Sequence, residues 1–79
     1  MILNINYFGL IAEATECNQE TMQVPVPCTV AILTQQLYQQ YPILQEKSFR
    51  IAVNRRLVVE NEVLTASDEV ALLPPFAGG

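Results

Sequence analysis

The sequence contains no histidine, only three glycines and only two cysteines, and just 15% of its 79 residues are charged. Without histidine, the chain lacks the ordinary general base of enzymes that work near neutral pH. The glycines stand at positions 9, 78 and 79, so there is no glycine-rich loop of the kind that holds phosphates. Two thiols without a histidine are too few for a structural zinc site. The sequence therefore predicts no catalytic acid–base set, no metal site and no cofactor.

The two cysteines are Cys17 and Cys28, and their spacing matches no zinc or redox motif. We interpret both as free thiols, as is usual in the reducing cytoplasm. A disulfide between them stays open if the fold brings their Cα atoms close together.

Composition and charge indicate one small acidic domain over residues 1–79, with 51% hydrophobic residues and a net charge of −4. Such a chain repels phosphate backbones and anionic lipids, so neither nucleic acid nor a membrane is expected as a partner. The low share of charged residues leaves apolar surface for a protein partner. Apolar runs are too short to cross a bilayer and no secretory pattern is present, so we expect a cytoplasmic protein.

Alternation of apolar and polar residues predicts a hairpin in the first third of the chain. Residues 2–8 and residues 20–26 both alternate with period two, as half-buried strands do. Pro25 lacks an N–H, so that end of the second strand should lie at an edge or outside the ladder. The long connection between the strands has room for a short helical turn at residues 10–15.

A helix is expected next, with the Thr29 hydroxyl as its N-cap. Apolar residues then recur at spacings of three and four, the pattern of a helix with one buried face: Val30, Leu33, Leu37 and Tyr41. Pro42 disfavours helical geometry at the residue before it, so the helix should end there. Residues 43–48 are expected to be a connection.

The second half of the chain predicts further strands, at residues 49–54, 57–59 and 70–73. The segment between the last two is polar and irregular, with Val63 and Leu64 turned inward. The last strand is apolar on both faces, as central strands usually are. This order predicts an α+β fold of the β-grasp, or ubiquitin-like, class. Its mixed sheet would have the first and last strands parallel at its centre, and one main helix would pack across it.

The C-terminal sequence Pro-Pro-Phe-Ala-Gly-Gly predicts a stiff exit followed by a thin tail. Pro74 and Pro75 fix φ and lack N–H donors, so the last strand should end there. Gly78 and Gly79 have no side chains to hinder approach to the terminal carboxylate. We interpret residues 74–79 as a flexible tail that can enter another protein's active site. The alternative is an ordinary frayed terminus.

Large apolar residues are expected at the base of this tail. Phe8 and Leu73 would end neighbouring parallel strands, although both could simply be core residues. Phe76 follows the two prolines on a departing segment, so we expect it to anchor in a partner's pocket. Arg55 and Arg56, in the turn after residue 54, either solubilise that turn or meet an acidic patch on a partner.

Several segments together resemble the MoaD family of sulfur carriers, the small subunits of molybdopterin synthase. They are Phe8-Gly9, Thr29-Val30, Ala52-Val53-Asn54, and the run from Asp68 to Pro75 that leads into Gly78-Gly79. The resemblance covers essentially the whole chain, and its C-terminal part is the most specific. The related thiamine sulfur carrier shares the terminal Gly-Gly but typically lacks the two prolines and is shorter. Leu73 stands where the family often has phenylalanine, and Phe76 where it often has valine. Both departures bear on the shape of the docking contact.

The resemblance implies a non-catalytic subunit whose Gly79 carboxylate carries sulfur. An ATP-dependent activating enzyme would adenylate that carboxylate, and sulfide would displace AMP to leave a thiocarboxylate. The sulfur would then pass to cyclic pyranopterin monophosphate in the large catalytic subunit of a heterotetrameric synthase, where molybdenum cofactor is built. Gly78 and Gly79 would serve this chemistry, and the partner-binding residues would be Phe8, Leu73, Pro74, Pro75, Phe76 and Ala77.

Three other functions stay open at this point. The chain could be a sulfur carrier for thiamine biosynthesis, or a ubiquitin-like modifier joined to lysines by an isopeptide bond. It could also be a β-grasp interaction module with an inert tail.

Overall fold

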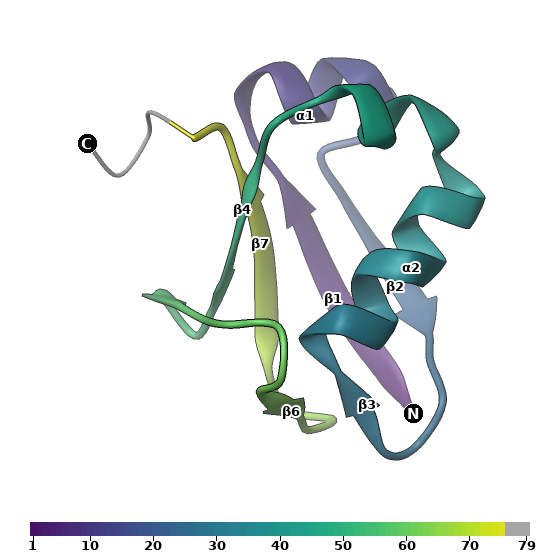
Figure 1. Cartoon of the computed structure of the whole chain (residues 1–79), viewed down its shortest axis with the longest axis vertical. Helices are drawn as coiled ribbons and strands as arrows, with labels where there is room; N and C mark the ends of the chain where they lie inside the picture. Colours follow the sequence, from purple (N-terminus) through teal and green to yellow (C-terminus); the bar gives the residue numbers. More distant parts are fainter. Residues whose placement is uncertain (76–79) are drawn as a thin grey trace.

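Five strands form one mixed sheet with the spatial order β2-β1-β7-β4-β5 (Figure 1). The computed structural model describes residues 1–75 of the chain. The strands of this sheet are β1 (Ile2–Tyr7), β2 (Gln19–Gln23), β4 (Arg50–Val53), β5 (Arg56–Leu57) and β7 (Glu69–Leu73). β1 runs antiparallel to β2 and parallel to β7, and β7 runs antiparallel to β4. The expected pair of parallel strands at the centre of the sheet is confirmed.

Helix α2 (Val30–Gln40) packs across one face of the sheet, as the apolar spacing predicted. The Thr29 hydroxyl accepts a hydrogen bond from the Ile32 N–H at 3.2 Å, which confirms the N-cap. Val30, Leu33 and Leu37 are buried beneath the helix. A short helix, α1 (Gly9–Thr15), connects β1 to β2. The hairpin, the crossing helix and the mixed sheet make this a β-grasp, ubiquitin-like fold.

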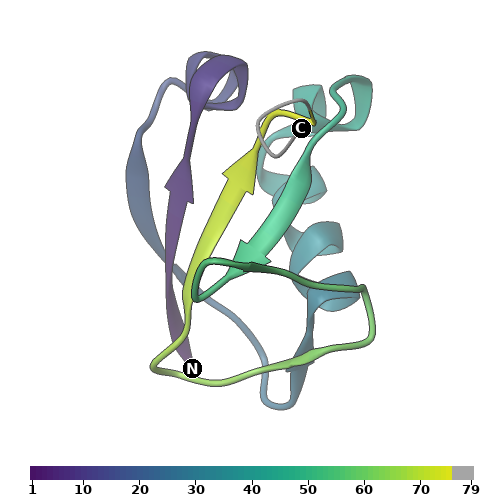
Figure 2. The same cartoon turned by 90° about the vertical axis from the view of Figure 1, so that its left-hand side faces the viewer.

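The two faces of the sheet differ because side chains alternate along each strand. The face toward α2 carries the core, which includes Leu3, Ile5, Tyr7, Ile51, Val53, Val70 and Leu72. Figure 2 looks onto the opposite face, which α2 does not cover. Any functional surface on the sheet itself therefore lies on this second face, called the open face below.

Several strand boundaries differ from those expected. β2 ends at Gln23 rather than at residue 26, because Pro25 has no N–H to donate to the ladder. β5 covers Arg56–Leu57 rather than residues 57–59. Residues 43–48, expected as a connection, largely form the 3₁₀ helix η1 (Pro42–Glu46), which buries Leu44.

A second, two-stranded sheet pairs β3 (Cys28–Thr29) with β6 (Val63–Leu64). The sequence predicted neither strand, since two residues are too few to show an alternation. Leu64 is buried as expected, but the inward position expected for Val63 is wrong, since its side chain is 58% exposed. Cys17 and Cys28 are both free thiols, so the disulfide that the sequence left open does not form.

Candidate functional site

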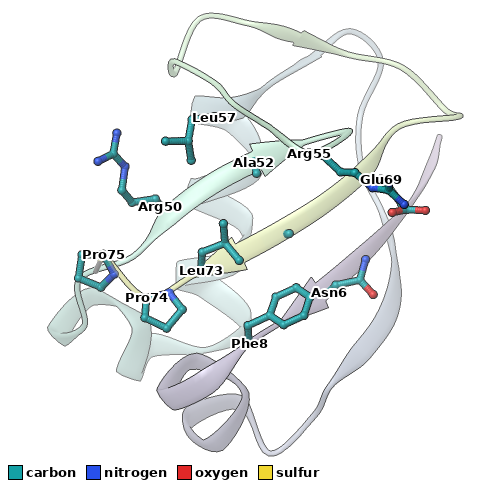
Figure 3. Close-up of a pocket in the computed structure, with 11 residues that line it drawn as sticks. Asn6, Phe8, Arg50, Ala52, Arg55, Leu57, Glu69, Leu73, Pro74 and Pro75 are labelled. Atoms are coloured by element: carbon teal, nitrogen blue, oxygen red, sulfur yellow. The ribbon is translucent and has the colours of Figure 1, made fainter. Parts of the chain in front are cut away.

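An open hollow of about 450 Å³ lies on the open face, where β1, β7 and β4 meet the start of the C-terminal segment (Figure 3). Ala52 and Ala71 are opposite each other in the β4–β7 register and line its floor. Their small side chains leave space between larger neighbours, which creates the hollow. The other residues that line it are Asn6, Phe8, Arg50, Arg55, Leu57, Glu69, Leu73, Pro74 and Pro75.

Phe8 stands at the rim of the hollow because its backbone is held on two sides. Its N–H donates to the Leu72 carbonyl at 3.2 Å, which continues the pairing of β1 with β7. Its carbonyl accepts from the Ile11 N–H at 3.1 Å, so the same residue is the N-cap of α1. The ring is 48% exposed. A large aromatic side chain is thus fixed in position yet half in solvent, which is typical of a binding surface.

The last strand delivers its end to the same hollow. Leu73 is half-buried and lies opposite Arg50 in the register. Pro74 is buried, and a Cβ atom added to Gly9 would lie 2.8 Å from its Cγ atom. Gly9 has a φ of 55°, a left-handed conformation that glycine adopts without strain. The first residue of the expected tail is therefore packed against α1, and the chain reaches solvent at Pro75.

The structure brings together four of the eight residues that the sequence singled out for the site: Phe8, Leu73, Pro74 and Pro75 line one hollow. The other four, Phe76, Ala77, Gly78 and Gly79, lie outside the described residues. Sequence reasoning missed Asn6, Arg50, Ala52, Leu57, Glu69 and Ala71. Period-two alternation places most of them on the side opposite the core, but their grouping depends on which strands are neighbours.

A two-residue turn at Asn54 and Arg55 closes the far end of the hollow. Both residues have positive φ, 52° and 69°, as a tight hairpin turn requires. The Asn54 amide stabilises this turn: its Nδ2 donates to Asp68 at 2.9 Å, and its Oδ1 accepts from the Glu69 N–H at 3.0 Å. A hydrogen bond from the Thr65 N–H, together with the Asn54 amide, holds the pKa of Asp68 below its usual value. The turn and the start of β7 are therefore joined by a network of hydrogen bonds.

A second polar cluster lies on the helix side of the sheet. The Glu20 carboxylate accepts hydrogen bonds from the hydroxyls of Tyr7 and Tyr41, which join β1 and β2 to the end of α2. Burial raises the pKa of both tyrosines, and the bond to Glu20 raises it further. The rings also meet edge to face, with centroids 5.9 Å apart. These contacts give the cluster a structural role, because they join the sheet to the C-terminal end of α2.

Over residues 1–75, no three cysteine, histidine or acidic side chains come together as a metal site would require. In the same residues, no helix is both long and apolar enough to cross a membrane. The hollow itself is apolar at its centre and carries no paired acid and base. An apolar centre with charged residues around it is the composition typical of protein docking surfaces.

Comparison with known proteins agrees with this geometry. A curated relative, the molybdopterin synthase sulfur carrier subunit of Mycobacterium tuberculosis, is 39% identical over 98% of this chain and 96% of its own length. A solved structure from Pyrococcus furiosus, described as subunit 1 of molybdopterin converting factor, superposes with a TM-score of 0.90. It is 22% identical, and the match covers 95% of this chain and 98% of that one.

Two further structures share the fold at 22% identity and over the full length of both chains. One is the small archaeal modifier protein SAMP1 of Haloferax volcanii, with a TM-score of 0.84. The other is the complex of subunits 1 and 2 of molybdopterin-converting factor from Helicobacter pylori, with a TM-score of 0.70. The ThiS family model matches residues 5–79, nearly the whole sequence. The chain therefore belongs to the ThiS family.

Proposed function

We propose that this chain is the sulfur carrier subunit of a molybdopterin synthase. The observation that carries the proposal is the near full-length relationship to a curated carrier subunit of that synthase. The open hollow supports it, because an apolar docking surface lies where the chain leaves the domain at Pro75. A carrier needs these two features side by side: a surface that holds the partner and an end that reaches into it.

The chemistry that we propose takes place at the Gly79 carboxylate. A carboxylate is a poor acyl donor because its leaving group would be oxide, so an activating enzyme first joins it to AMP with release of pyrophosphate from ATP. Sulfide then attacks the mixed anhydride, AMP leaves, and a thiocarboxylate remains. The nucleophilic sulfur passes to cyclic pyranopterin monophosphate in the large subunit, and two such transfers build the dithiolene that holds molybdenum.

The length of the C-terminal segment limits the geometry of the complex. Residues 76–79 each extend the chain by at most about 3.5 Å, so a Gly79 carboxylate can lie no further than about 14 Å from Pro75. The large subunit must therefore hold its pterin within that distance of the hollow. Glycine at the last two positions allows passage through a narrow channel, because no side chain widens the segment.

Reconstitution of sulfur transfer tests this function. Carrier, activating enzyme, ATP, a sulfide source, the large subunit and cyclic pyranopterin monophosphate should together form the dithiolene product. A carrier that lacks Gly79, or that bears an added residue after it, should fold equally well and yield no product. Product formation by such a carrier would contradict the role of the terminal carboxylate. Isopeptide conjugates to lysines in cells, without any thiocarboxylate, would instead favour a protein modifier.

A further inference from the structure

The charges around the hollow differ in sign from those of the rest of the chain. Two basic residues, Arg50 and Arg55, and one acidic residue, Glu69, line it. The whole chain has four basic and eight acidic residues. Two basic and seven acidic residues therefore remain for all other surfaces, so the hollow carries a net positive charge on a strongly negative molecule.

Arg50 stands at the end of the hollow from which the C-terminal segment leaves. It is the first residue of β4, it is exposed, and it lies opposite Leu73 in the register. Figure 3 shows its side chain on the same side of the hollow as Pro75 and Leu57, far from Glu69. Its guanidinium is thus available to a partner that approaches the base of the C-terminal segment.

Arg55 stands at the opposite end, in the turn that the Asn54 amide holds in place. Its side chain extends across the rim toward Glu69 in Figure 3. The neighbouring residue Arg56 differs from Arg55 in its position and in its partner. It does not line the hollow, and it makes a two-pronged ion pair with Glu62 at 2.8 and 3.2 Å. Within residues 1–75, this pair is the one salt bridge between side chains.

We propose that Arg50 and Arg55 select the partner by charge: the hollow docks a protein surface whose apolar anchor is flanked by carboxylates. The assignment rests on the proposed function and names the large subunit as the owner of that acidic surface. Most of this chain is negative and repels an acidic partner, so the two arginines favour orientations that bring the C-terminal segment to that partner. Planar guanidinium groups suit carboxylates because they bind them through two parallel hydrogen bonds.

Binding to the large subunit, measured by calorimetry at about 50 mM and about 500 mM NaCl, tests the assignment. Arg50→Gln and Arg55→Gln should each weaken binding about 2- to 5-fold at the lower salt concentration, as exposed ion pairs usually do. The double variant should lose about 4- to 25-fold, since the two sites are at opposite ends of the hollow. At the higher concentration the Debye length falls to roughly 4 Å, and the double variant should approach the wild type to within about 2-fold.

Arg56→Gln is the matched control, because it removes the same charge from a neighbouring residue outside the hollow. It should bind within about 1.5-fold of the wild type. The urea midpoint of each variant shows that the fold is intact.

Four results would overturn the assignment, and they differ in whether the proposed function fails with it. If the double variant binds as tightly as the wild type at low salt, or if Arg56→Gln weakens binding equally, the charge assignment fails and the proposed function stands. If sedimentation shows a wild-type dimer that the double variant lacks, the hollow belongs to a second copy of this chain. If the wild-type chain does not bind the large subunit at all, the proposed function fails too.

Discussion

Substitution of Gly9 by alanine should destabilise the domain at the point where its C-terminal segment begins. Gly9 has a φ of 55°, and the left-handed region costs a residue with a side chain about 1–2 kcal/mol. The new Cβ would also lie 2.8 Å from the Cγ of Pro74, a distance that forces Pro74 or α1 to move. Crowding of this kind costs about 1–3 kcal/mol in a packed core. The two effects together predict a loss of roughly 2–5 kcal/mol in the free energy of unfolding.

A loss of that size is large for a chain of 79 residues, whose total stability should be roughly 4–12 kcal/mol. Urea denaturation should show it as a fall of about 1–3 M in the midpoint, with an unchanged slope. The same measurement in a Pro74→Ala background separates the two causes, because alanine has no Cγ. There, Gly9→Ala should cost only the conformational part, about 1–2 kcal/mol.

Two results would refute this reasoning. A cost below about 0.5 kcal/mol in the wild-type background would show that neither effect operates. An equal cost in both backgrounds would show that contact with Pro74 contributes nothing, and that the close approach of α1 to the C-terminal segment is not a constraint.

Two further predictions concern docking and pH. Phe8→Ala and Phe76→Ala should each weaken binding to the large subunit about 30-fold, because buried aromatic anchors contribute about 2 kcal/mol. Val63 is exposed but lies outside the hollow, so the control Val63→Ala should change the affinity less than about 2-fold. Unchanged affinity of both phenylalanine variants would show that neither ring is an anchor. Asp68 has a lowered pKa, so its contribution to stability is complete above its ordinary value of 3.8 and is lost as the pH falls through the lower folded-state value. Acid titration of the unfolding midpoint should show this loss in the wild type and not in Asp68→Asn, and solvent screening of the partly exposed carboxylate keeps it under about 1 kcal/mol. If the unfolding midpoints of the wild type and Asp68→Asn fall equally at low pH, this contribution of Asp68 is absent.

Local patterns were enough to predict the main elements of the fold. Thr29 and the apolar spacing that follows it define α2, because capping and amphipathicity are properties of neighbouring residues. The apolar run of β7 correctly indicated a central strand: Val70 and Leu72 are buried toward α2, and Ala71 and Leu73 give the hollow its apolar surface. The parallel pairing of β1 with β7 followed from the β-grasp order of elements.

The hollow could not be predicted in the same way. Its floor exists because Ala52 and Ala71 are opposite each other, and that register links two strands far apart in sequence. The structural role of Gly9 depends on its close approach to Pro74, 65 residues later by their numbering, and neighbouring residues give no sign of it. Nothing in the sequence singles out Arg50, which reads as one charged residue in a strand. Its importance appears only when its neighbours across the sheet are known.

The central claim is that the Gly79 carboxylate carries sulfur, and intact mass measurement tests it most directly. The purified chain is incubated with ATP, the activating enzyme and a sulfide source, and its intact mass is then measured. Parallel samples omit ATP or use a chain extended beyond Gly79. The account predicts that one oxygen atom is replaced by sulfur in the complete reaction, and that fragmentation places the sulfur on Gly79. An unchanged mass with an active enzyme, or sulfur found on Cys17 or Cys28 instead, would contradict it.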